Sequence, residues 1–313
     1  MRYYIALDIG GTKLRAASFQ GQKVEPTKRY ITFSQEKGTE SRDNLIYAIR
    51  AVWPQNESVE AIGIAVAGSI NLRTGVIEKS PNIPAFTDFP IVNFLEETFQ
   101  VPIYLGNDAN LAALGEWKVG AGIGHNFIIY LTISTGIGSG VINNGKLLLG
   151  VNGMGAELGH VTMIPDGIRC SCGKKGHLEA YASGPAITRW FLDEIEKGEE
   201  SILKNVEHIT SKEIANAAYK GDHLSIEAYN RAGYILGLAI VNFLHIFNPT
   251  CIIFGGGVSN SIDLMLPKIN KVIHDEALDS GYYENLTLTT SKLHDDVGII
   301  GALVLAREIR DLV

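Results

Sequence analysis

Cysteine and long hydrophobic runs are scarce in this chain. Only three of its 313 residues are cysteines, and two of them stand one residue apart, which excludes the disulfide framework of a small secreted domain. The most hydrophobic stretch, residues 234–247, is too short to span a bilayer and is followed by Asn248 and Pro249, so it predicts a buried core helix. No charged and apolar leader and no low-complexity segment is found. We therefore expect a cytoplasmic protein without a membrane partner.

Basic residues are outnumbered by acidic ones. With 27 Lys and Arg against 34 Asp and Glu, the net charge of −7 argues against a nucleic-acid-binding surface. The length of the chain allows a core of considerable size and suggests two lobes.

Strand-like and helix-like segments alternate after an opening hairpin, which indicates an α/β chain. Strands are expected at residues 4–8, 14–19, 61–67, 103–105, 127–133, 138–142, 145–149, 251–254 and 286–289. Helices are expected at residues 41–52, 91–98, 110–118, 185–197, 211–220, 234–247, 261–275 and 297–312.

Two Gly/Thr loops of the same design each follow an apolar strand and lead into another strand. The first contains Gly10, Gly11, Thr12 and Lys13, and the second contains Thr135 and Gly136. Neither is a P-loop or a dinucleotide fingerprint, because those motifs open a helix. Glycines let backbone N–H groups approach an anion closely, and the threonine hydroxyls add donors. The pair predicts a clamp for a polyphosphate, although a single loop of this kind is also an ordinary hairpin turn and Lys13 an ordinary solvated lysine.

A third glycine-rich turn, formed by Gly255, Gly256 and Gly257, follows the apolar strand at residues 251–254. At the carboxyl end of a strand such a turn permits the flat approach of a nucleoside. Close packing of a helix against the sheet explains the same glycines equally well.

Two aspartates stand where strands are expected to end. Asp108 lies between a short strand and a helix, where it is a candidate general base for a sugar hydroxyl, although Asn107 or Asp108 is also an ordinary helix cap. A helix N-terminus favours the ionised form of such a carboxylate. Asp8, at the end of the first strand, is the candidate ligand of Mg²⁺, directly or through water.

Four metal-ligand side chains lie within eighteen positions: His160, Cys170, Cys172 and His177. The segment is too polar and glycine-rich to be core, which favours a metal over buried apolar cysteines. Four protein ligands leave no open position for water, so the pattern predicts a structural zinc ion. A redox role for the cysteine pair is disfavoured by the strain of a disulfide across one residue.

Six motifs, in the order LDIGGTK, GNDAN, TISTGIGSG, GAELGH, CSCGKKGHLEAYASG and IIFGGGVS, resemble those of the ROK family of repressors, open reading frames and kinases. The resemblance covers essentially the whole chain. It implies a two-lobed, actin/hexokinase-like (ribonuclease H-like) α/β fold with a zinc-binding loop at about residues 157–180. The small lobe would be residues 1–113 with the C-terminal helix from about residue 298, and the larger lobe residues 114–297.

The same resemblance implies an activity and assigns residues to it. It implies ATP and Mg²⁺ in a cleft and phosphorylation of a hexose or N-acetylhexosamine. Asp108 matches the family's catalytic base, and Asn107, Glu157, His160 and Glu179 match its sugar ligands. The zinc ligands match as well, except that His177 stands where family members usually have a third cysteine. Gly68 and Asn82 lie in segments that resemble the sugar-contacting loops of family glucokinases.

Three classes of function remain to be weighed. The first phosphate loop begins at about residue 8, which leaves no room for the DNA-binding helix-turn-helix of family repressors and favours an enzyme. A non-catalytic sugar-sensing regulator is disfavoured by the intact Asp8 and Asp108, and a zinc hydrolase by the lack of an open metal position.

Glucose is the preferred substrate on resemblance, with N-acetylmannosamine, N-acetylglucosamine and fructose as alternatives. The expected partners are sugar and ATP, and the expected assembly is a homodimer or a dimer of dimers.

Overall fold

The computed structural model describes residues 1–33, 39–80 and 83–312 of the chain. Asn82, predicted to contact sugar, falls outside the described residues. The chain forms two compact units. Met1–Asn126, Gly140–Ala156 and Ser291–Val313 make up the first, and Phe127–Ser139 and Glu157–Thr290 the second. The expected division into lobes near residue 113 stays a prediction.

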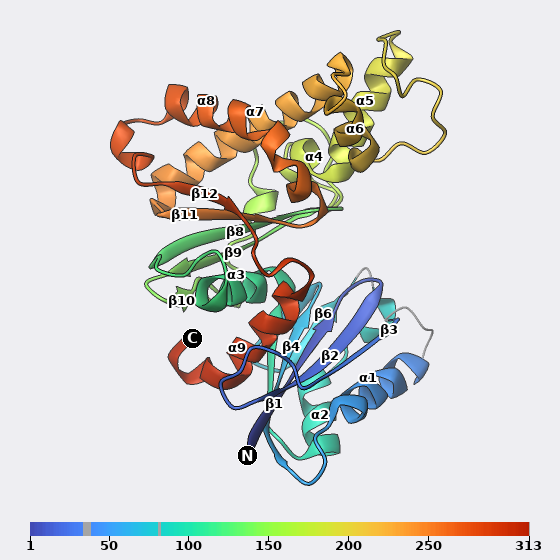
Figure 1. Ribbon diagram of the computed structural model, residues 1–313, viewed down its shortest axis with the longest axis vertical. Coiled ribbons are helices and arrows are strands. Elements are labelled where there is room, and N and C mark those ends of the chain that lie inside the picture. Colours follow the sequence, from blue (N-terminus) through green and yellow to red (C-terminus); the bar gives the residue numbers. More distant parts are fainter. Residues whose placement is uncertain (34–38, 81–82, 313) are drawn as a thin grey trace. The chain divides into compact units, whose positions relative to one another are not determined.

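The first unit is built on a five-stranded sheet in the order β3-β2-β1-β4-β7 (Figure 1). Its strands are β1 (Arg2–Ile9), β2 (Lys13–Gln20), β3 (Lys28–Phe33), β4 (Ser58–Val66) and β7 (Ile103–Asn107). β1 pairs antiparallel with β2 and parallel with β4, and β4 pairs parallel with β7. The carboxyl ends of three parallel strands therefore meet at one edge of this sheet.

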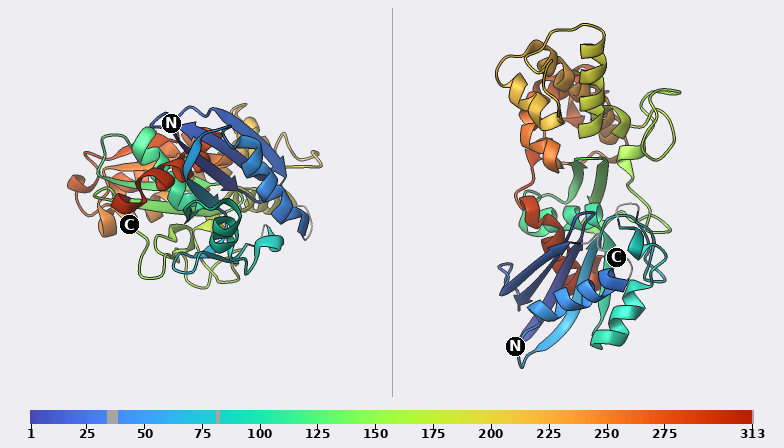
Figure 2. Two further views of the ribbon diagram at one scale, coloured as in Figure 1. Left: turned by 90° about the horizontal axis from the view of Figure 1, so that it is seen from below. Right: turned by 90° about the vertical axis from the view of Figure 1, so that its right-hand side faces the viewer.

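Different helices cover the two faces of this sheet. Ile5, Leu7 and Ile9 of β1 belong to a buried apolar cluster that includes residues of α1 (Thr39–Val52) and α2 (Ile91–Phe99). The alternate residues of β1 point to the opposite face, which α9 (Val297–Leu312) covers (Figures 1 and 2). Gly63 of β4 lets the helix come close, since a Cβ there would lie 1.9 Å from the backbone oxygen of Ala302.

Helix α9 also packs against α3 (Asp108–Val119), and glycine makes this contact possible. A Cβ atom added to Gly301 would lie 1.9 Å from the backbone oxygen of Leu111. Backbone atoms cannot move aside as a flexible side chain would, so the helices would have to separate.

We expect Gly301→Ala to lower the free energy of unfolding by roughly 2–3 kcal/mol, because it overpacks the α3–α9 contact. Chemical denaturation of both proteins measures this difference. Gly257→Ala is the matched control, since its Cβ would meet no atom within 4 Å, and its effect should stay within about 0.5 kcal/mol. Equal stabilities of the Gly301 variant and the parent would contradict the close helix contact.

The second sheet has the order β10-β9-β8-β11-β12. Its strands are β8 (Phe127–Ile133), β9 (Ile137–Asn143), β10 (Lys146–Leu147), β11 (Cys251–Gly255) and β12 (Thr287–Thr290). As in the first sheet, a Gly/Thr loop joins the first two strands of the sequence, here β8 and β9. β11 then pairs parallel with β8 and with β12. The repeated design inferred from the two Gly/Thr loops is thus a repeat of sheet topology.

Four helices of the second unit pack around the longest one, α7 (His223–Phe247) (Figure 1). They are α4 (Glu179–Ala182), α5 (Gly184–Glu196), α6 (Ser211–Ala218) and α8 (Leu266–Glu276). The expected core helix at residues 234–247 is the second half of α7, which ends at Asn248 in a left-handed conformation before Pro249. Among the described residues, no helix is long and apolar enough to cross a membrane.

Several expected elements are wrong in extent. The expected helix at residues 261–275 is a 3₁₀ helix, Gly257–Leu264, followed by α8, because Ser261 has non-helical backbone angles and Pro267 opens a new helix. The strand expected at 145–149 shrinks to β10. β3, α4, and the short strands β5 (Ser69–Asn71) and β6 (Val76–Lys79) were not predicted. The first half of α7 was also missed, because polar residues there mask its helical period.

Candidate active site and metal centre

Several predicted site residues of the first unit gather at the carboxyl edge of its sheet. Asn107 ends β7, and its Nδ2 donates to the backbone oxygen of Gly68, which follows β4, at 3.3 Å. The Asn107 Oδ1 accepts the backbone N–H groups of Ala109 and Asn110 at 3.0 and 3.3 Å. Asn107 is therefore the cap of α3, and Asp108 is the first residue of the helix, where positive partial charge favours a carboxylate.

Asp8 lies at the same edge, near the end of β1, and its carboxyl group packs against the start of α9. A Cβ added to Gly298 would lie 2.8 Å from the Asp8 Cγ. Burial raises the pKa of Asp8 from 3.8 to about 6, and Arg15 on β2 opposes this rise. Burial still dominates over Arg15, so Asp8 suits a cation ligand, because a bound cation would offset the cost of the buried charge.

The raised pKa makes Asp8 a source of instability at neutral pH. The folded state holds the Asp8 proton more tightly than the unfolded chain, so the contribution of Asp8 to stability falls as pH rises from about 4 to about 6. We expect Asp8→Asn to raise the free energy of unfolding at pH 8 by up to about 3 kcal/mol and to change it little at pH 4. Denaturation of both proteins at the two pH values, without divalent cations, measures the difference. An equal effect at both pH values would contradict burial of the charge.

In the second unit, Glu179 connects the second Gly/Thr loop to the cysteine segment. Its Oε2 accepts the backbone N–H of Ile137 at 3.1 Å, and its Oε1 accepts hydrogen bonds from Ser171 and Cys170. A Cβ on Gly136 would lie 2.5 Å from the Glu179 Oε2, so any larger residue there would displace this carboxylate. Burial raises the pKa of the Glu179 carboxyl, but these hydrogen bonds outweigh burial and lower it overall. The carboxylate therefore stays ionised and orients the loop.

The four predicted metal ligands come together. The donor atoms of His160, Cys170, Cys172 and His177 all lie within 4.8 Å of one another. The Cys170 Sγ is 3.7 Å from the His160 Nδ1, and the Cys172 Sγ is 3.3 Å from the His177 Nδ1. Ligand atoms on a tetrahedral zinc ion are roughly 3.3–3.8 Å apart, given bonds of about 2.0–2.3 Å. The cluster thus fits one ion.

The backbone forms a hairpin that presents these ligands. Antiparallel bridges join Thr162 to His177 and Arg169 to Lys175. The backbone N–H of Cys170 donates to the Lys174 oxygen at 2.8 Å, which closes the turn that carries the two cysteines. Burial is the main cause that raises the pKa of the Cys170 thiol to about 12 in the metal-free protein, so metal binding there must release a proton.

The second Gly/Thr loop and the third glycine turn both line a hollow of about 970 Å³ in the second unit. Thr135 and Gly257 line it, together with Gly184, Lys212 and Tyr219. Its volume falls at the upper end of the range of roughly 300–1,000 Å³ for small-molecule sites. A nucleotide-sized ligand can therefore enter.

The three glycines of the third turn serve different ends. A Cβ on Gly255 would lie 2.0 Å from the Tyr130 hydroxyl, and one on Gly256 would lie 2.5 Å from the Ile133 oxygen. Only Gly257 faces open space and lines the hollow. Close packing against β8 therefore accounts for two of the glycines, and the contacts are with strand residues and not with a helix.

The remaining predicted residues lie on the surface or partly exposed. Glu157 is exposed at the start of a short 3₁₀ helix. At the first Gly/Thr loop, the Gly10 N–H donates to the Lys13 oxygen at 3.0 Å, while Gly11 is partly buried and Thr12 and Lys13 are exposed.

Sequence reasoning missed Ser171, Gly298 and the hollow's Lys212 and Tyr219. Ser171 stands between the two cysteines, a position that could have suggested a partner for Glu179. Gly298 opens α9 without any glycine-rich motif, so no local signal marks its contact with Asp8.

The chain is similar to known proteins along nearly its whole length. The model of the ROK family matches residues 4–309. A glucokinase of Thermotoga maritima is 34% identical over 97% of both chains. The crystal structure of the ROK hexokinase from Thermus thermophilus has a TM-score of 0.84, 32% identity and 99% coverage of both chains. A ROK family glucokinase from Streptomyces griseus, solved with glucose and AMPPNP, has a TM-score of 0.81 and 30% identity, covering 97% of this chain and 99% of that one.

The chain belongs to the ROK family, as its motifs predicted. Its two-sheet α/β fold matches that of the family's sugar kinases. Xylose repressors also resemble it, but the chain covers only 63% of the length of one such repressor, against 97% of the glucokinase. The protein is an ATP-dependent sugar kinase.

Proposed function

We propose that the protein phosphorylates glucose to glucose 6-phosphate. The observation that carries the proposal is the carboxyl edge of the first sheet, where Gly68, Asn107 and Asp108 adjoin one another. Glucokinases at 31–34% identity support glucose over other sugars. The fold alone would suit other hexoses and N-acetylhexosamines as well.

Asp108 is the proposed general base. It accepts the proton of the attacking sugar hydroxyl, so the oxygen gains nucleophilicity as it bonds to the terminal phosphorus of ATP. The bond from that phosphorus to the bridging oxygen breaks, and ADP leaves. Asn107 fixes the start of α3 through its cap and its bond to Gly68 and thereby orients Asp108. A positioned base contributes most when its rotamer is held in this way.

The hollow in the second unit is the proposed nucleotide site. Thr135 offers a hydroxyl to phosphate from the wall of the hollow, Gly136 beside it offers its backbone, and Gly257 lets the nucleoside lie flat. Asp8, with Gly10, Gly11, Thr12 and Lys13 beside it, would hold Mg²⁺ and phosphate oxygens on the first unit. The ion would neutralise charge on the transferred phosphoryl group.

A structural zinc ion is the proposed occupant of the cysteine and histidine cluster. Ser171, which stands between the two cysteine ligands, donates to Glu179, so fixing the hairpin fixes this carboxylate. Glu157 and Glu179 are proposed sugar ligands, and His160 would use one ring nitrogen for metal and the other for sugar. The metal thus orders a sugar-binding segment without taking part in phosphoryl transfer.

A panel of sugars with ATP, followed by coupled detection of ADP, tests the proposal. We expect kcat/KM to be highest for glucose among glucose, fructose, mannose, N-acetylglucosamine and N-acetylmannosamine. A higher value for another sugar would reassign the substrate. Binding of sugar without turnover of any member would favour a sugar-sensing regulator.

A further inference from the structure

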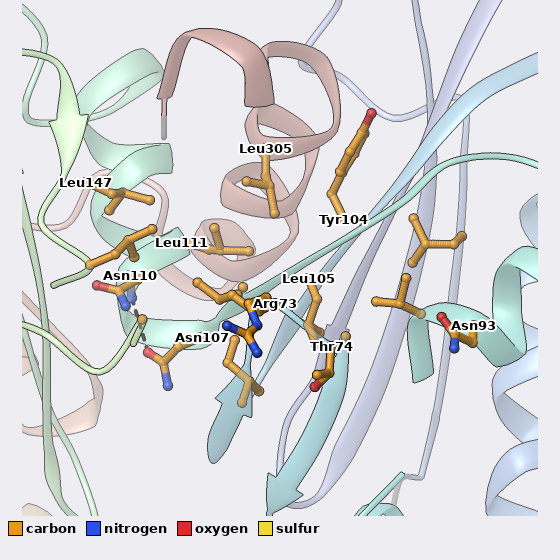
Figure 3. Close-up of a pocket in the computed structure, with 18 residues that line it drawn as sticks. Arg73, Thr74, Asn93, Tyr104, Leu105, Asn107, Asn110, Leu111, Leu147 and Leu305 are labelled. Carbon is orange, nitrogen blue, oxygen red and sulfur yellow. Dashed lines mark hydrogen bonds between the residues drawn. The ribbon is translucent and has the colours of Figure 1, made fainter. Parts of the chain in front are cut away.

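Apart from the hollow in the second unit, the first unit contains a cavity of its own, which adjoins the candidate active site. Its volume is about 320 Å³, and it runs along β7, the edge strand of the first sheet (Figure 3). Apolar side chains form most of its wall, among them Leu111, Leu147 and Leu305. Asn107 belongs to both the cavity and the candidate active site.

A buried carboxamide lies in this wall without a hydrogen-bond partner for its oxygen. Asn110 of α3 is 5% exposed, and no described residue donates to its Oδ1. A buried polar atom without a partner costs roughly 1–3 kcal/mol, so native proteins seldom retain one. Rotation of the carboxamide exchanges its oxygen and nitrogen, and Asn110 can therefore offer an acceptor or a donor to a molecule in the cavity.

The charge of the cavity is one-sided. Arg73, from the turn between β5 and β6, extends over the cavity (Figure 3), and none of the lining residues is acidic. A guanidinium at the mouth and an apolar interior suit a molecule with an anionic head and an apolar body. The volume exceeds what a single small ion needs.

We propose that this cavity binds a small apolar carboxylic acid beside the proposed sugar site, with which it shares Asn107. The apolar body would occupy the leucine-lined interior, the carboxylate would pair with Arg73, and Asn110 would bond the acid or a water molecule that it retains. The proposal does not depend on which sugar the enzyme phosphorylates, since binding is measured without turnover.

Calorimetric titration with 3-phenylpropionate tests the proposal on the whole protein, with its neutral amide and with acetate as comparison ligands. We expect saturable binding of the acid, at least about fivefold weaker binding of the amide, and no measurable binding of acetate. Those differences would reflect the charge on Arg73 and the apolar interior, respectively.

Variants locate the bound acid. Arg73→Met should weaken its binding about tenfold, and Leu72→Trp, which fills the cavity from the same turn, should abolish it. Arg50→Met, at an exposed arginine on α1, is the matched control and should leave the affinity unchanged.

The proposal would be overturned if the acid does not bind at a concentration of 20 mM (roughly the weakest measurable affinity), or if its binding survives both cavity variants. Equal affinities for acid and amide would also overturn it. Because Arg73 is exposed, Arg73→Met should fold normally, and the proposal can be tested with it even if Leu72→Trp fails to fold.

Discussion

Replacement of Asp108 by Asn is expected to lower kcat by roughly 10²–10⁴, the usual contribution of a positioned general base. The amide keeps the shape of the carboxylate but cannot accept the proton of the sugar hydroxyl. Asn107, which caps α3, is untouched, so the fold and the sugar KM should change little. Steady-state kinetics with glucose and ATP measure both constants.

Asp43→Asn on α1 is the matched control, because this aspartate is exposed and belongs to no candidate site. Its kinetics should equal those of the parent protein. Near-normal turnover of the Asp108 variant would remove Asp108 from the role of base. A loss of kcat accompanied by an equal loss of stability would instead indicate a structural role at the start of α3.

Much of the first sheet could be predicted because local patterns suffice there. The alternation along β1 separates Ile5, Leu7 and Ile9 from the side chains that face α9. Asp8 and Asp108 could be placed at strand ends from hydropathy alone. The strand order then brings their segments to one edge, since parallel strands share their carboxyl ends.

What escaped prediction depends on contacts between distant segments. The bonds that hold the Glu179 carboxylate were not predicted: its oxygens accept from Ile137, Cys170 and Ser171. No spacing in the sequence reveals that Gly136 lies against it. The cavity beside β7 was missed for the same reason, because five separate segments build its wall.

Removal of the metal is expected to weaken sugar binding while the core of the protein stays folded. Protein purified without chelator should contain one zinc ion per chain, held by His160, Cys170, Cys172 and His177. Chelation or Cys172→Ser should raise the sugar KM at least about tenfold and the ATP KM much less, because groups that orient a set of ligands typically contribute about 10–100-fold. Thermal stability should also fall, since metal binding orders the hairpin. The core of the first unit is built from other residues, and the protein should still fold.

Elemental analysis and two series of variants give the direct test. Cys251→Ala, at the buried cysteine of β11, should keep its zinc and serves as the control for loss of a thiol. His177→Ala should lose the metal and His177→Cys should retain it, because thiolate and imidazole are both competent ligands. The Cys170 thiol must lose its proton to bind, so zinc affinity should increase with pH. Less than about 0.2 zinc per chain together with full activity would refute a structural metal site of this kind.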